Sequence, residues 1–116
     1  MNDTLNELYE VILSRKETSG EESYTGYLFR EGIDKILKKI GEESAETIIA
    51  AKSLEAAPGD GKKMSDLENE VCDLIYHLLV LLAERDIPIE RIDAILKERS
   101  LKSGNLKKTK TVDKNS

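Results

Sequence analysis

Residues 33–51, IDKILKKIGEESAETIIAA, repeat their apolar and small side chains with the spacing of an α-helix. At about 100° per residue these side chains share one face of the helix. They are Ile33, Ile36, Leu37, Ile40, Ser44, Ile48 and Ala51. The pattern continues to Pro58, a residue that does not fit a helix interior. The stretch therefore predicts one long helix that ends before the turn Pro58-Gly59-Asp60-Gly61.

A second helix is predicted directly after this turn. Ser65 and Glu68 form a capping box, which places the helix at about 66–85. Both helices carry a charged edge beside their apolar face. The edge residues are Lys35, Lys39, Glu42, Glu43 and Glu46 on the first helix, and Asp66, Glu70, Asp73, His77 and Glu84 on the second. Because the turn is short, we expect an antiparallel pair whose acidic edges face each other across a groove.

The remaining segments are also helical or irregular. Thr4 and Glu7 form a capping box for a helix over about 5–16, and the polar stretch 17–23 is a loop that precedes a short turn or helix. Pro88 opens a last helix. Because no segment alternates like a strand, the prediction is an all-α bundle of about four helices.

The run Leu74–Ala83 is apolar around nearly its whole circumference. A surface helix of a small monomer shows a polar half. We therefore expect a second subunit to cover this helix, so that a homodimer completes the bundle. The alternative is a buried central helix of a monomer.

The 116-residue chain is long enough for one domain, which we place at 1–101. The segment 102–116 contains five lysines and one aspartate and has no apolar face to bury, so it is predicted to be a disordered tail.

Composition also excludes several partners. The net charge of -5 argues against a general nucleic-acid-binding protein. The longest apolar run is far shorter than the roughly 20 residues of a membrane span. The single cysteine, Cys72, cannot form an intrachain disulfide, and no apolar leader is present. We therefore expect a cytoplasmic protein without nucleic-acid or membrane partners, in which Cys72 is a small packed residue.

The acidic edges indicate a metal site. Carboxylates that face one another repel unless a cation lies between them. Oxygen ligands suit a hard divalent ion, and Mg²⁺ is usually held by carboxylates together with substrate phosphates. The alternative is a solvated acidic face whose glutamates pair with Lys35, Lys38 and Lys39.

These charges belong to a longer pattern that spans both predicted helices and the segment before them. It comprises Ser23-Tyr24-Thr25, Leu28-Phe29, Gly32, Lys35-Ile36, the run 38–43 (KKIGEE), Glu46, Glu70, Asp73-Leu74 and the run 76–82 (YHLLVLL). The joint pattern resembles the phosphoribosyl-ATP pyrophosphatases, a family within the MazG-like all-α nucleotide pyrophosphohydrolases. The chain departs from it at Gly26, Tyr27, Ser44 and Cys72. Tyr27 stands where lysine is frequent, so the resemblance does not imply a phosphate contact there.

The resemblance implies an Mg²⁺-dependent hydrolase that converts phosphoribosyl-ATP and water into phosphoribosyl-AMP and pyrophosphate, the second step of histidine biosynthesis. The implied metal ligands are Glu42, Glu43, Glu46, Glu70 and Asp73. The implied catalytic carboxylates are Glu43, Glu46 and Glu70, of which Glu70 either joins the ligands or helps to activate water.

The implied substrate contacts are Lys35, Lys39, Ser23, Tyr24 and Thr25. For the two lysines the alternative is ion pairing, and for the 23–25 segment it is helix capping by Ser23 with Tyr24 as an apolar anchor. Two other functions stay open: a MazG-like pyrophosphohydrolase of a free (d)NTP, and a non-enzymatic dimeric helical module.

Overall fold

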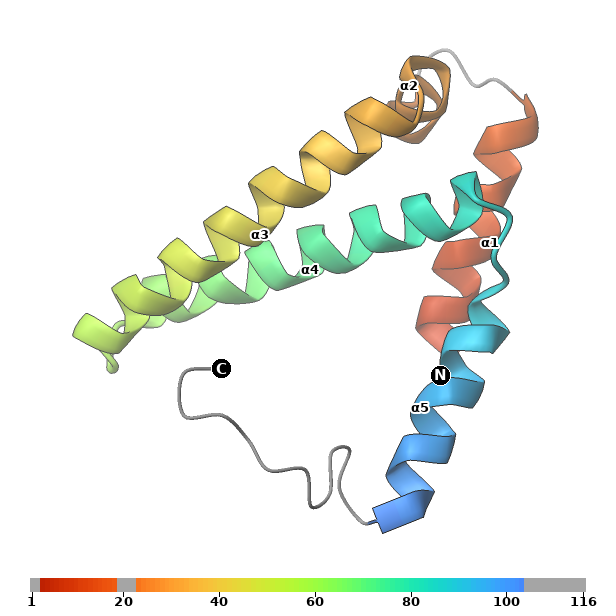
Figure 1. Cartoon of the computed structure of the whole chain (residues 1–116). Coiled ribbons are helices and arrows are strands. Elements are labelled where there is room, and N and C mark those ends of the chain that lie inside the picture. The colour runs from red at the N-terminus through yellow and green to blue at the C-terminus, as the bar shows by residue number, and fades with distance from the viewer. Residues whose placement is uncertain (1–2, 19–22, 104–116) are drawn as a thin grey trace.

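The computed structural model describes residues 3–18 and 23–103, and within these ranges the chain forms helices and no strand (Figure 1). The helices are α1 (Asp3–Thr18), α2 (Tyr24–Glu31), α3 (Ile33–Ala56), α4 (Gly61–Glu84) and α5 (Ile89–Ser103). The all-α prediction is confirmed. The helix beyond the four expected is α2, which forms in the segment predicted to be either a turn or a short helix.

Helices α3 and α4 form the predicted antiparallel pair, joined by the short turn at 57–60 (Figure 1). The predicted start of α4 is wrong, because the helix begins at Gly61 and Ser65 lies inside it. Asp60 is the actual N-cap: its side chain accepts hydrogen bonds from the backbone N–H groups of Lys62 (2.9 Å) and Lys63 (3.1 Å). Thr4 likewise lies inside α1.

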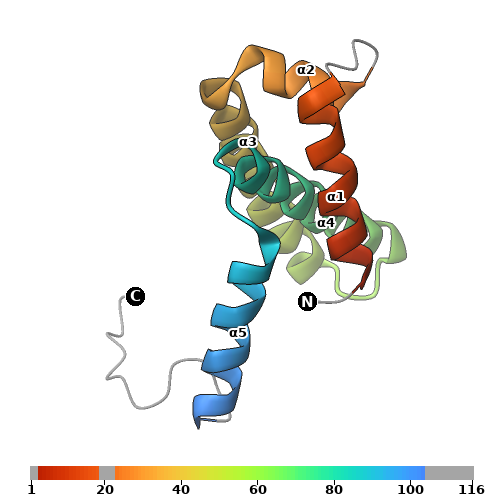
Figure 2. The same cartoon turned by 90° about the vertical axis from the view of Figure 1, so that its right-hand side faces the viewer.

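The hydrophobic core lies at the end of the α3 and α4 pair that α1 and α2 cover. Its buried side chains are Tyr9, Ile12, Leu28, Ile36, Leu79, Val80, Ala83 and Ile89. The Tyr9 hydroxyl donates a 2.6 Å hydrogen bond to the Ile87 carbonyl, which ties α1 to the segment between α4 and α5. Helix α5 leads away from this packed end (Figures 1 and 2).

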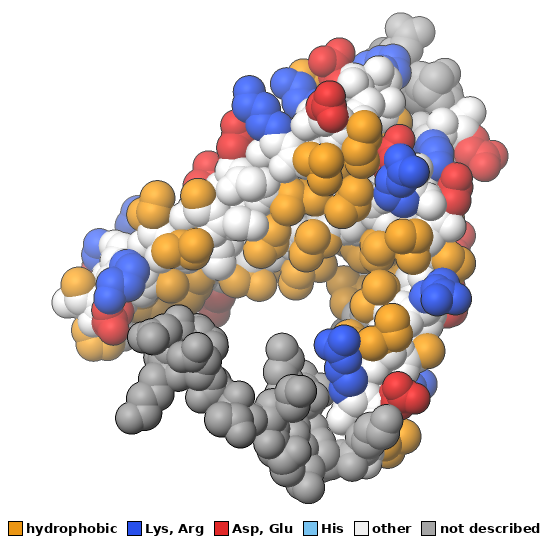
Figure 3. Space-filling model, in the orientation of Figure 1, with side chains coloured by type: hydrophobic (Ala, Val, Ile, Leu, Met, Phe, Trp, Pro, Cys, Tyr) orange, Lys and Arg blue, Asp and Glu red, His pale blue; other side chains and the backbone are white. Residues whose placement is uncertain are grey.

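The other end of the pair has only two helices. Apolar side chains remain exposed along the middle of α4 and on α5. Val71, Ile75 and Leu78 of α4 are 38%, 37% and 41% exposed. Figure 3 shows such hydrophobic side chains on the surface near α4 and α5. Cys72 is also exposed, so the expectation of a packed cysteine is wrong for the single chain. The expected second subunit stays a prediction.

Two further expectations concern the chain's extent and its relation to membranes. Helix α5 runs to Ser103, and residues 104–116 of the expected tail lie outside the described residues. Among the described helices, none combines the length and hydrophobicity that crossing a bilayer requires.

Candidate active site

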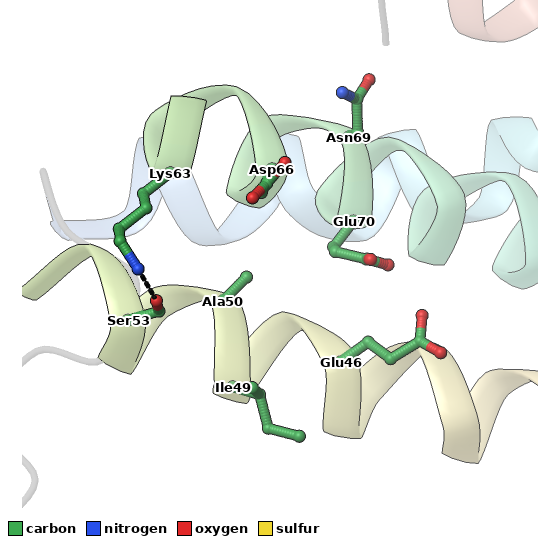
Figure 4. A pocket seen from close by; sticks show the side chains of 8 residues that line it. All are labelled: Glu46, Ile49, Ala50, Ser53, Lys63, Asp66, Asn69 and Glu70. Atoms are coloured by element: carbon green, nitrogen blue, oxygen red, sulfur yellow. Dashed lines mark hydrogen bonds between the residues drawn. The ribbon is translucent and has the colours of Figure 1, made fainter. Parts of the chain in front are cut away.

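Three carboxylates meet between α3 and α4: Glu43 and Glu46 from α3, and Glu70 from α4. One oxygen from each lies within 4.8 Å of the others. The spacing i, i+3 puts Glu43 and Glu46 on the side of α3 that faces α4. In Figure 4 the carboxylates of Glu46 and Glu70 point toward each other across the gap between the helices. We call these residues the carboxylate triad.

The triad is partly shielded from water. Glu43 is only 7% exposed. Within the described part of the chain, Oε2 of Glu43 and Oε1 of Glu70 are buried and have no hydrogen-bond partner. Burying an acceptor without a partner is costly, and a bound cation would give both oxygens a partner.

The pKa values of Glu43 and Glu70 also reflect the close approach of the three carboxylates. Desolvation raises the pKa of Glu70 to about 7, and the neighbouring Glu46 and Glu43 add to this rise. Desolvation also raises the pKa of Glu43, and the neighbouring Glu46 and Asp73 add to this rise, while Glu70 opposes it. A bound cation would reverse these effects, because it favours the charged carboxylates. The all-oxygen donor set fits a hard divalent ion.

The other two predicted ligands lie at the edge of this site. The charge of Asp73 raises the pKa of Glu43, so the two side chains are near each other, but Asp73 is not one of the three that meet. Glu42 forms an ion pair with Lys39, with Nζ and Oε1 3.2 Å apart. The structure thus brings together three of the five predicted ligands.

The segment 23–25 is tied into the fold. Ser23 is the N-cap of α2 and accepts a 2.8 Å hydrogen bond from the Gly26 N–H, so the capping interpretation is confirmed. The buried Thr25 hydroxyl is hydrogen-bonded to the hydroxyl of Tyr76. Tyr24 keeps 46% of its surface exposed.

His77 fixes the position of Tyr24. The Nδ1–H of His77 donates a 2.8 Å hydrogen bond to the Asp73 carbonyl, since a carbonyl only accepts. In neutral histidine Nε2 is then the acceptor for the Tyr24 hydroxyl, at 2.8 Å. His77 is therefore a buried histidine that joins α2 to α4 next to the triad.

A pocket of about 320 Å³ continues from the triad toward the α3 to α4 turn (Figure 4). It is lined by Glu46, Ile49, Ala50, Ser53, Lys63, Asp66, Asn69 and Glu70. At its far end Nζ of Lys63 donates a 2.7 Å hydrogen bond to Oγ of Ser53. Lys63 and Ser53 were not among the site residues predicted from the sequence. Their signal was the spacing, since each lies seven residues from a triad glutamate on its own helix and so shares its face.

Comparison of the sequence with known proteins identifies the family of the chain. The profile of the family described as Phosphoribosyl-ATP pyrophosphohydrolase matches residues 5–100. The chain belongs to this family. It is 50% identical over 105 residues to a protein of Clostridium novyi (strain NT) named phosphoribosyl-ATP pyrophosphatase, covering 90% of this chain and 88% of the relative.

Two further relatives bear the same name. One, from Listeria welshimeri, is 48% identical over 109 residues, or 94% of this chain and 97% of the relative. The other, from Clostridium acetobutylicum, is 51% identical over 106 residues, or 91% of this chain and 89% of the relative. The predicted membership is confirmed, and a hydrolase is supported over a non-enzymatic helical module.

Nζ of Lys35 lies over the ring of Tyr27, 5.7 Å from the centroid. Lys39 lies closer to the triad, where its hydrogen bond with Glu42 raises its pKa. Both predicted lysines are therefore held on one side of the triad, opposite Lys63.

Proposed function

We propose that this chain hydrolyses phosphoribosyl-ATP to phosphoribosyl-AMP and pyrophosphate, the second step of histidine biosynthesis, in the groove between α3 and α4. Its family and the shared name of its relatives support the reaction. One observation carries the location: three carboxylates meet within 4.8 Å, although two of their oxygens are buried without a partner among the described residues.

The carboxylate triad fits Mg²⁺, and Glu43, Glu46 and Glu70 would hold it, with Asp73 beside them. When bound, the ion neutralises the triad and the substrate phosphates and polarises the phosphoryl oxygens. Glu42 contributes indirectly in this proposal, because it pairs with Lys39 and holds that ammonium group next to the site.

The side chains of this chain position water and substrate. In this proposal Glu70 also accepts a proton from the attacking water, because its carboxylate points into the groove opposite Glu46 (Figure 4). The water oxygen bonds to phosphorus, the bond between the α- and β-phosphates breaks, and pyrophosphate leaves. Lys39, one turn before Glu43 on α3, contacts the departing phosphates. Lys35 precedes Lys39 by another turn and so lies farther from Glu43.

Two substitutions that replace a charged carboxylate with an uncharged amide of similar shape test this site. Glu46→Gln and Glu70→Gln should each lower pyrophosphate release from phosphoribosyl-ATP by roughly 10²- to 10⁴-fold, the usual effect of removing a catalytic acid or base. Glu55→Gln and Glu68→Gln are the matched controls, because both glutamates are exposed on the same two helices. Folded triad variants with wild-type rates would overturn the assignment.

A second experiment measures the binding of Mg²⁺ in the absence of substrate. Mg²⁺ should raise the melting temperature of the wild-type protein as RT ln(1 + [L]/Kd) predicts, and this stabilisation should be lost in Glu46→Gln. Equal stabilisation of both proteins would argue against a metal on the triad. Comparing turnover of phosphoribosyl-ATP with that of dNTPs tests the alternative of a free (d)NTP substrate.

The proposal extends to assembly and location. The exposed Val71, Ile75 and Leu78 on α4, together with Ile95 and Leu96 on α5, supply the apolar surface of a homodimer. A soluble nucleotide substrate and a single cysteine that is free suit the cytoplasm.

A further inference from the structure

We propose that Lys63, held by Ser53, binds the one phosphate of the substrate that lies outside its triphosphate chain, the 5′-phosphate of the phosphoribosyl arm, and so distinguishes phosphoribosyl-ATP from ATP. This inference rests on the proposed function, since it assigns a subsite within the same groove. Lys63 is a specificity-determining residue in this view and takes no part in the hydrolysis itself.

The first observation is the charge arrangement in the pocket next to the triad. Lys63 is the one cation among its eight lining residues, and three acids line it as well. Two of these acids, Glu46 and Glu70, belong to the triad at one end. Lys63 closes the opposite end by reaching across to Ser53 on α3 (Figure 4). The pocket thus has a metal-binding end and a cationic end.

The second observation is that the Lys63 ammonium group has more N–H donors than the single one that Ser53 accepts. Of its three N–H donors, one goes to Ser53 at 2.7 Å. No ion pair of Lys63 with an acid is found among the described residues. The third acid of the pocket, Asp66, pairs with Lys62 at 3.3 Å. The positive charge of Lys63 is therefore left for a ligand.

The third observation is the length of the pocket. Glu46 and Ser53 on α3, and Glu70 and Lys63 on α4, are each seven residues apart, or about 10 Å at 1.5 Å per residue. Lys39 lies only one turn from Glu43, which suits phosphates directly linked to the cleaved bond. A phosphate at the Lys63 end must instead be separated from the metal by sugar and base, and the 320 Å³ between them gives these room. Phosphoribosyl-ATP has such a phosphate, and ATP does not.

Lys52 offers a matched control. It lies on α3 next to Ser53 and carries the same charge, but its side chain is 74% exposed and pairs with Glu55, and neither of these two residues lines the pocket. A general loss of positive charge near the turn would affect both lysines equally. A phosphate subsite depends on Lys63 alone.

The experiment measures binding of phosphoribosyl-AMP and of AMP by calorimetry with Mg²⁺ present. Lys63→Met should weaken phosphoribosyl-AMP binding about 10- to 100-fold, as expected for a charge-assisted hydrogen bond, and leave AMP binding within about twofold. Lys52→Met should change the binding of neither ligand, and Lys63→Arg should keep most of the preference. Ser53→Ala should give a smaller loss in the same direction, because it removes only the anchor.

Two results would overturn the subsite. One is equal weakening of both ligands by Lys63→Met, which indicates that Lys63 only holds α3 to α4. The other is unchanged binding of both. Failure of the proposed function is distinguishable, because it appears in the wild-type protein as absent pyrophosphate release from phosphoribosyl-ATP. If the wild type hydrolyses phosphoribosyl-ATP and Lys63→Met does not discriminate, the subsite alone is wrong.

Discussion

Two properties of Glu70 disfavour its charged form. Its oxygen Oε1 is buried without a partner in the described part of the chain, and its pKa is raised to about 7 by desolvation and by Glu46 and Glu43. Without a bound cation, the negative charges of the triad therefore repel one another. Sites that bind metal or do chemistry often keep such unfavourable charge where a fully optimised fold would remove it.

This repulsion predicts how stability depends on pH. Because the pKa of Glu70 is higher in the folded state than its ordinary value of 4.5, the folded protein binds the proton more tightly. The associated stability is fully present below about pH 4.5 and is lost as the pH rises through about 7. In EDTA, Glu70→Gln should therefore be more stable than the wild type at pH 8, with a weaker decline between pH 5 and pH 8.

Thermal melts across this pH range, with Glu68→Gln as the control, check the prediction. Identical slopes for the wild type and Glu70→Gln would contradict it. Saturating Mg²⁺ should reduce the difference between the two proteins at pH 8 only if the triad binds the ion in the wild type.

The ends of α4 show what tertiary contacts add to helix signals. At its C-terminus the N–H groups of Asp86 and Ile87 donate to the carbonyls of Ala83 (3.1 Å) and Leu82 (2.8 Å), which is the Schellman pattern. Asp86 takes the left-handed conformation, with φ of 58°, where glycine is usual. Lys16 of α1 stabilises this end by an ion pair to Asp86 at 2.9 Å and a hydrogen bond to the Ala83 carbonyl at 2.8 Å.

Substitution of Asp86 separates backbone conformation from the ion pair. Asp86→Ala and Asp86→Gly both lose the contact with Lys16, which is worth little because Asp86 is exposed. Only glycine adopts the left-handed conformation without strain. The glycine variant should therefore be more stable than the alanine variant by about 1 kcal/mol. Urea unfolding at one protein concentration measures the difference, and equal stabilities would show that the backbone strain is absent.

The sequence predicted which segments form helices better than it predicted the residues at which the helices begin and end. The extent of α3 follows from its apolar spacing and from Pro58. The start of α4 did not follow, because Asp60 and Ser65 are both chemically able to cap a helix. The turn after α3 decides between them: it places the Asp60 carboxylate 2.9 Å from the Lys62 N–H.

In the molecule as a whole, one face of α4 is packed and another is uncovered. Leu79 and Val80 are buried in the core, whereas Ile75 and Leu78 on the same part of the helix stay exposed. Since isolated domains rarely expose so many large apolar side chains together, we expect a second copy of the chain to cover them.

A charge placed on this surface tests the dimer. Wild-type protein should sediment as a dimer at micromolar concentration, and Ile75→Lys should sediment as a monomer with a lower melting temperature. Glu68→Lys, an exposed polar position on the same helix, should remain dimeric. A monomeric wild type would contradict the proposed assembly.

Secondary structure and family followed from local information: spacing of apolar residues, turn residues and a joint motif are all visible along the chain. The three-carboxylate site did not, because five acids fit the motif equally well and only the packing of α3 on α4 selects Glu43, Glu46 and Glu70. The role of His77 as a link to Tyr24, and the pairing of Lys63 with Ser53, also required the fold. The physical reason is that a side chain's partners across helices depend on the rotation of each helix about its axis, which core packing sets.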